Sequence, residues 1–163
     1  EDADKYRYQH LCDAITFIPY GCIVDAFQTY CYENPQLTHQ ERKNYWRKIE
    51  REYLPHRVYS DNAFLASGGY FERQHHIFEN PLYYLDYTIA QVVALEFFLE
   101  SRKDHKAAFE KYLAFDKLGG RYPFRELLKK AGIKNPMDGD TLKEVSSEIM
   151  NYLSTFDAQA LDR

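Results

Sequence analysis

The stretch at residues 6–33 reads YRYQHLCDAITFIPYGCIVDAFQTYCYE. Its apolar residues recur at steps of three and four, the spacing that places side chains on one face of an α-helix. The members of this stripe are Leu11, Ile15, Ile18, Cys22, Ile23, Ala26, Phe27 and Tyr30. We therefore expect a long amphipathic helix, kinked or split at Pro19, because proline lacks the amide hydrogen that an uninterrupted helix needs.

The helical pattern continues after the Asn34-Pro35 pair that ends this stripe. Thr38 with Glu41 has the spacing of a capping box, which predicts a second helix that runs to about residue 53. Residues 55–72 have few periodic positions and are expected to form a connection. The Asn80-Pro81 pair predicts the start of a third helix that runs to about residue 102. That helix is apolar on most faces, so it should be buried centrally.

Three shorter helices are expected in the remainder of the chain. They should run from about residue 104 to 118, from 123 to about 132, and from a cap at Asp140 or Thr141 onward, with Glu144 completing a capping box. We find no run of strand length that alternates apolar and polar residues. The predicted fold class is therefore all-α.

Composition limits the classes of function. The chain has 163 residues and fits one domain with a substantial core. Its net charge of −4, with both signs mixed along the sequence, argues against nucleic acid or an anionic membrane as the main partner. No apolar run approaches about 18 residues, so no membrane span is expected. Three cysteines without a C-x-x-C pair fit free thiols in a reducing compartment, which predicts a cytoplasmic protein.

The chemical motifs of several enzyme classes are absent from the sequence. None of the six histidines is followed by Glu, so the H-E-x-x-H motif of zinc proteases is missing. There is also no P-loop, no G-x-G-x-x-G and no G-x-S-x-G. Glu72 and His75 form one E-x-x-H pair. A di-iron bundle needs two such pairs and two further Glu residues, so we do not favour a di-iron site.

Residues 73–87, RQHHIFENPLYYLDY, hold the strongest candidate site. In a helix that begins at Pro81, the hydroxyl groups of Tyr83, Tyr84 and Tyr87 would project together. A neutral phenol with a pKa of about 10 is a hydrogen-bond donor at neutral pH, and several donors aimed at one point can stabilise an oxyanion. His75 or His76 could add another donor. Alternatively, the tyrosines pack in the core and the histidines lie in a surface loop, which spacing alone favours.

Several segments together resemble a known family. They are EDADKYRYQHL, AITFIPYGCIVDAFQ, YENPQLTHQERKNYWRKIEREYLPHR, SGGYFERQHHIF and NPLYYLDYTIAQVVALEFF, and they cover most of residues 1–100. In these segments the chain resembles the C-terminal part of the catalytic domain of oligoendopeptidase F-like zinc metallopeptidases, relatives of thimet oligopeptidase. The resemblance implies a multi-helix subdomain of a zincin-type helical oligopeptidase. It also implies that the zinc ligands and the general-base Glu lie upstream of residue 1, so that this chain supplies no metal ligand.

The resemblance also assigns roles to individual residues. The catalytic donors implied by the R-Q-x-H and Y-x-x-Y motifs are His76, Tyr84 and Tyr87, and the implied substrate-binding residues are Tyr83, Gly68, Gly69 and Arg73. The two glycines would let a loop adjust to the substrate, whereas the simpler interpretation is a turn with positive φ. The implied reaction is zinc-assisted hydrolysis of short peptides.

We expect residues 1–163 to form a single helical subdomain, with residues 1–100 in the substrate cleft and 103–163 as closing helices. Its partners would be a short peptide and the upstream zinc-bearing part of the same protein. The chain alone would be inactive, and it would self-associate through exposed apolar faces. The alternative is a non-enzymatic helical module that keeps the peptidase fold for binding or assembly. In that case the tyrosine face would be covered by its own packing or by a second copy.

Overall fold

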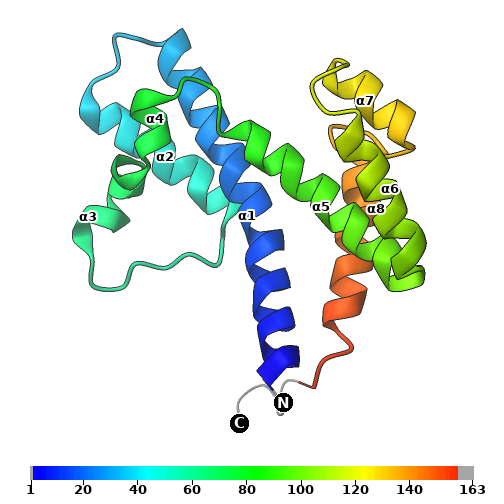
Figure 1. Ribbon diagram of the computed structural model, residues 1–163. Coiled ribbons are helices and arrows are strands. Elements are labelled where there is room, and N and C mark those ends of the chain that lie inside the picture. The colour runs from blue at the N-terminus through cyan, green and yellow to red at the C-terminus, as the bar shows by residue number, and fades with distance from the viewer. Residues whose placement is uncertain (1, 158–163) are drawn as a thin grey trace. The chain divides into compact units, whose positions relative to one another are not determined.

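The computed structural model describes residues 2–157, and these are helical with no strand among them (Figure 1). The predicted all-α fold class is therefore confirmed. The α-helices are α1 (Asp2–Glu33), α2 (His39–Tyr53), α3 (Ala63–Ala66), α4 (His75–Glu79), α5 (Leu85–Lys103), α6 (His105–Lys117), α7 (Phe124–Ala131) and α8 (Gly139–Leu153), and a 3₁₀ helix, η1, spans Gly69–Arg73. None of these helices is both long enough and apolar enough to cross a membrane.

The described chain divides into two compact units. Unit 1 comprises residues 2–15 and 89–157, and unit 2 comprises residues 16–88. Helices α1 and α5 each contribute residues to both units. The expectation of a single subdomain with a cleft part up to residue 100 stays a prediction.

Helix α1 continues through Pro19, so it is not split there, and a kink at Pro19 stays a prediction. A proline inside a helix removes one backbone hydrogen bond and costs about 3 kcal/mol. The residues on either side of it offset this cost, since Ile18, Tyr20 and Ile23 are all buried and each buried apolar side chain contributes about 1.5–3 kcal/mol. The free energy gained by packing in this segment therefore outweighs the tendency of proline to break a helix.

Unit 2 has an aromatic core centred on Trp46 of α2, the one tryptophan of the chain. The Trp46 side chain is fully buried, and its ring lies 5.2 Å from that of Phe27 and 5.9 Å from that of Phe71. Helix α2 presents this face because the capping box of Thr38 and Glu41 starts it as predicted. The packed core holds α1, α2 and η1 together, and these elements in turn position α4.

The start of α5 differs from the prediction. The helix begins at Leu85, because residues 80–83 form a turn in which the amide of Tyr83 donates to the carbonyl of Asn80 at 3.4 Å. Leu82 adopts a positive φ of 55°, which is unusual for a residue with a branched side chain. The turn leaves Tyr84 ahead of the helix with its ring in the core. Burial of the Tyr84 ring therefore outweighs the preference of Asn80-Pro81 for starting a helix, and α5 starts later than predicted.

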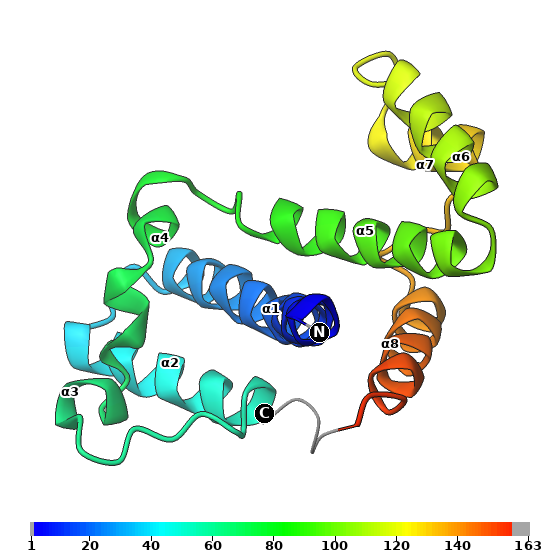
Figure 2. The same cartoon turned by 60° about the horizontal axis from the view of Figure 1, so that its bottom comes forward.

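Unit 1 contains α6, α7 and α8, with α6 packed against α7 (Figure 2). Val93, Leu128 and Ile133 form its buried apolar cluster. Asp104 caps α6, close to the expected start near residue 104, and α7 ends at Ala131 with Gly132 as its C-cap. Helix α8 is capped by Asp138 and not by Asp140 or Thr141, since the carboxylate of Asp138 accepts from the amide of Asp140 at 3.2 Å.

Candidate functional site

In unit 2 the structure brings His76 together with the three predicted tyrosines. The His76 ring lies 5.1 Å from the ring of Tyr84 and 5.5 Å from that of Tyr87, in edge-to-face arrangements. The ring of Tyr87 also contacts Tyr84 at 5.4 Å and Tyr83 at 5.2 Å. We call these four residues the tyrosine–histidine cluster. Its members come from α4, from the turn before α5 and from the first turn of α5.

The members of the cluster differ in exposure. Tyr84 is 8% exposed and packs against Phe17 and Tyr20 of α1. Tyr87 is 40% exposed and Tyr83 is 47% exposed. The Tyr87 hydroxyl lies 3.4 Å from His76 Nε2. Tyr83 and Tyr87 therefore offer surface to a ligand in this unit, whereas the Tyr84 ring belongs largely to the core.

A buried glutamine from α1 holds α4 in place. Gln28 is almost fully buried, and its Nε2 lies 3.4 Å, 3.2 Å and 3.5 Å from the carbonyl oxygens of His76, Ile77 and Asn80. The last carbonyl groups of a helix lack intrahelical donors, so this amide satisfies part of the end of α4. Our reasoning from sequence missed Gln28, whose only signal is an amide among the apolar residues of the stripe.

Two further residues, Gln74 and Tyr20, were not predicted from the sequence. Gln74 contacts His76 directly, and Tyr20 contacts it through Gln74. The Tyr20 hydroxyl donates to Gln74 Oε1 at 2.6 Å, and Gln74 Nε2 lies 2.8 Å from His76 Nδ1. Gln74 precedes α4 as its N-cap residue. The signal for Gln74 was present in the R-Q-x-H motif, but nothing local in the sequence pointed to Tyr20.

The pKa values of Tyr84 and Tyr87 are raised above the ordinary value of a phenol. Partial burial and the neighbouring Tyr87 raise the pKa of Tyr84. Partial burial and a hydrogen bond with Tyr83 raise the pKa of Tyr87. An ordinary tyrosine already titrates near pH 10. Both hydroxyl groups are consequently neutral donors at physiological pH.

The remaining predicted site residues lie before α4. Gly68 has a φ of 98°, and a Cβ there would lie 2.0 Å from the Lys43 carbonyl oxygen, so both the backbone conformation and the close approach require glycine. Gly69 has no positive φ, but a Cβ there would lie 2.6 Å from the Phe64 ring. These contacts support the interpretation of a tight turn. Arg73 places its guanidinium 5.1 Å from the centre of the Tyr70 ring.

The described residues offer no ligand set for zinc. No group of three His, Cys, Asp or Glu side chains comes together within residues 2–157. The E-x-x-H pair is directed elsewhere, because Glu72 contacts His39 at 3.0 Å and Lys43 at 3.3 Å while His75 contacts Glu79 at 2.8 Å. The prediction that the catalytic metal is held outside this chain stays a prediction.

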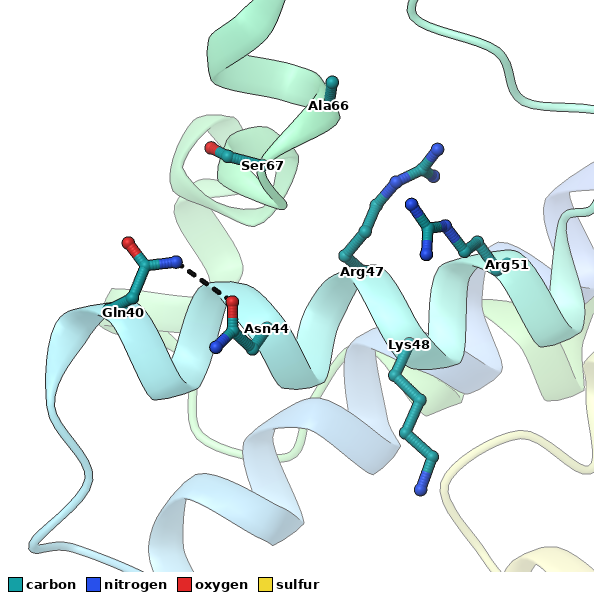
Figure 3. Close-up of a pocket in the computed structure, with 7 residues that line it drawn as sticks. All are labelled: Gln40, Asn44, Arg47, Lys48, Arg51, Ala66 and Ser67. Carbon is teal, nitrogen blue, oxygen red and sulfur yellow. Dashed lines mark hydrogen bonds between the residues drawn. The ribbon is translucent and has the colours of Figure 1, made fainter.

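An open pocket of about 480 Å³ lies between α2 and the end of α3 (Figure 3). Its lining residues are Gln40, Asn44, Arg47, Lys48, Arg51, Ala66 and Ser67. Arg47 is already paired with the buried Glu50 at 2.9 Å, and Lys48 points away from the two arginines. No predicted site residue lines this pocket, so the tyrosine–histidine cluster remains the better candidate.

Comparison with solved structures identifies relatives, although no protein-family model and no curated protein matches the chain. A structure designated as an oligoendopeptidase F is 46% identical with a TM-score of 0.94, and the match covers 98% of this chain and 28% of that one. PZ peptidase A, solved with an inhibitor, is 43% identical with a TM-score of 0.92, covering 96% and 28%. A protein from Bacillus anthracis strain Ames, also designated as an oligoendopeptidase F, is 38% identical with a TM-score of 0.78, covering 96% and 25%.

These matches extend over nearly the whole chain and confirm the resemblance inferred from its motifs. The chain spans only about a quarter of the length of the matched structures, so it corresponds to a part of such a protein. By identity and by fold, the chain corresponds to a helical part of the oligoendopeptidase F structures that it matches.

Proposed function

We propose that this chain forms one wall of the active site of an oligoendopeptidase that hydrolyses short peptides with zinc. The observation that carries the proposal is the pairing of His76 with the partly exposed Tyr87, which groups two potential donors on a surface of unit 2. The chain that bears this pair is 38–46% identical to peptidase structures, one of which was solved with an inhibitor.

The chemistry follows from what these groups donate. Hydrolysis of an amide passes through a tetrahedral intermediate whose oxygen carries negative charge, and fixed donors stabilise that charge. A neutral phenol at Tyr87 and a ring N–H at His76 are suitable donors, because neither has to change protonation state first. In the longer protein zinc would activate the attacking water, but its ligands would come from outside the described residues.

The other predicted residues would contribute to substrate binding. Tyr83 packs edge-on against Tyr87 and exposes nearly half of its surface, so it is placed to contact a peptide beside the donor pair. Arg73 lies at the end of η1, and Gly68 and Gly69 lie at its start. Their role in substrate binding is a proposal that rests on the family resemblance.

The rival function is a non-enzymatic helical module. It predicts that the tyrosine face is covered by the protein's own packing or by a second copy. Tyr84 is indeed buried, but Tyr83 and Tyr87 are only partly covered by other residues of the chain. The partial exposure of these two side chains favours a ligand-binding face and hence the peptidase proposal.

The test uses the longest protein that contains this chain, assayed with fluorogenic short peptides. Tyr87→Phe should lower kcat by about 10²- to 10³-fold, the usual effect of removing one oxyanion donor. Tyr53→Phe, which removes an exposed hydroxyl of the same unit outside the cluster, should retain wild-type kcat. A longer protein that cleaves no short peptide would contradict the function, and an active, folded Tyr87→Phe variant with wild-type kcat would exclude the role of Tyr87.

A further inference from the structure

We propose that Tyr20 and Gln74 are positioning residues that fix the neutral tautomer of His76, so that Nδ1 accepts and Nε2 carries the proton. The structure contains an unbroken series of polar contacts from Tyr20 through Gln74 and His76 to Tyr87. The tautomer assignment stands on these contacts alone. Its consequence for catalysis rests on the proposed function.

The series is anchored at Tyr20, whose ring is held by the core of unit 2. This ring is buried and lies edge-on to those of Trp46, Tyr70 and Tyr84. Burial raises the pKa of the Tyr20 hydroxyl, which is therefore protonated. A hydroxyl held in this way is a fixed donor that cannot follow a movement of Gln74.

The distance from Tyr20 to Gln74 decides the orientation of the amide. The 2.6 Å separation is typical of a hydroxyl that donates to an oxygen, whereas contacts between amide nitrogen and oxygen are usually about 2.9–3.0 Å. The amide oxygen of Gln74 thus faces Tyr20. Its NH₂ group necessarily faces the other way, toward His76.

The amide then decides the tautomer. An amide nitrogen can only donate, so Nδ1 of His76, 2.8 Å away, must accept. A neutral imidazole that accepts at Nδ1 carries its proton on Nε2. Had the amide been reversed, its oxygen would have faced Nδ1 and selected the opposite tautomer.

The tautomer determines which hydroxyl proton remains available. With the proton on Nε2, His76 presents an N–H toward the oxygen of Tyr87, 3.4 Å away. The phenolic proton of Tyr87 is then not required by His76 and can be donated to Tyr83 or to a ligand. In the opposite tautomer Tyr87 would donate to Nε2, and one donor of the site would be lost. The positioning residues therefore keep the phenolic proton of Tyr87 available as a donor on the surface of unit 2.

The test is long-range ¹H–¹⁵N NMR of the histidine rings in the 163-residue chain, at a mildly alkaline pH where neutral imidazole predominates. We expect the Nε2–H tautomer for His76. Gln74→Glu is isosteric but presents a carboxylate that only accepts, so it should switch His76 to the Nδ1–H tautomer. His75→Gln, which removes the neighbouring ring, is the matched control and should leave the His76 tautomer unchanged. A wild-type Nδ1–H tautomer, or an unchanged tautomer in Gln74→Glu, would overturn the inference.

A second measurement separates this inference from the proposed function. In the longer protein, Gln74→Glu should lower kcat by about 10- to 100-fold with little change in KM, an effect typical of residues that orient a functional side chain. A tautomer switch in the chain accompanied by unchanged kcat would uphold the positioning role and refute the catalytic role of His76. Absence of the switch would refute the positioning role, whatever the activity.

Discussion

Tyr84 and Tyr87 are three positions apart and yet have different environments. The ring of Tyr84 belongs to the aromatic core, whereas Tyr87 keeps 40% of its surface exposed beside His76. The turn at Leu82 causes this difference, because it places Tyr84 before α5 and Tyr87 within its first turn. At the level of single residues, one tyrosine is part of the core and the next keeps a partly exposed side chain.

The buried tyrosines should make the chain sensitive to alkali. Burial raises the pKa of Tyr84 in the folded protein, whereas a tyrosine in the unfolded chain has a pKa of about 10. The folded state therefore binds the phenolic proton more tightly, and the resulting stability is complete below about pH 10 and is lost as pH rises through the folded pKa. We expect the melting temperature to fall above about pH 10, and to fall less in Tyr84→Phe than in wild type. Tyr53→Phe is the exposed control, and an equal alkaline slope in all three proteins would contradict the expectation.

At the scale of elements, α1 organises unit 2 through side chains on its buried face. Gly21 allows a close approach to Thr88 of α5, since a Cβ at residue 21 would lie 1.8 Å from the Thr88 Oγ1. Tyr20, one residue before Gly21, and Gln28, about two turns after it, contact Gln74 and the end of α4. A change in the position of α1 would therefore disturb both the packing of unit 2 and the orientation of His76.

Gly21→Ala should destabilise the protein by about 1–3 kcal/mol, because overpacking forces neighbouring atoms to shift. Gly139→Ala is the matched control, since Gly139 is also helical but has open space around its Cβ position. It should be neutral or stabilise by up to about 1 kcal/mol. Denaturant unfolding measures both changes. Equal stability of Gly21→Ala and wild type would show that α1 and α5 can separate locally at no cost.

Local signals predicted most of the long helices, although they misplaced the cap of α8, and long-range packing decided the start of α5. The capping box of Thr38 and Glu41 lies at the start of the helix that it caps, so the sequence contains the whole signal. The start of α5 depended on burial of Tyr84, which no local pattern records. For the candidate site, the motif residues were predicted together, but Tyr20 is 54 positions from Gln74 and Gln28 is 48 positions from His76. A pattern read along the chain cannot pair residues so far apart.

At the scale of the whole molecule, the chain contains a candidate donor pair and no described cluster of metal ligands. It also spans about a quarter of the length of its structural relatives. Under the proposed function, the residues that bind the substrate and those that hold the metal would come from different segments of a longer protein.

The isolated chain should bind no catalytic zinc and cleave no peptide. After equilibration with zinc and dialysis, its metal content should match that of a metal-free control protein, and fluorogenic peptides should remain intact. The physical reason is that no three ligating side chains converge within residues 2–157. Chelator-sensitive cleavage with a rate proportional to the chain concentration would contradict this prediction.

We also expect the isolated chain to self-associate. Large apolar side chains such as Val58, Phe78 and Phe109 are more than half exposed. Exposed apolar surface of this kind favours association between copies of the chain. Sedimentation velocity over a concentration series should show an increasing mass, and Phe78→Asp should weaken the association. A strictly monomeric species at high concentration would contradict the expectation.

The burial of Trp46 also makes unfolding of one unit optically distinct. Indole emission shifts to longer wavelength when water reaches the ring, and because unit 1 contains no tryptophan, the emission of this chain reports on unit 2 alone. Far-ultraviolet circular dichroism, by contrast, reports on the helices of both units. Coincident melting curves from the two signals would indicate one cooperative transition. Separate midpoints would show that the unit bearing the donor pair gains or loses its structure independently of the remainder of the chain.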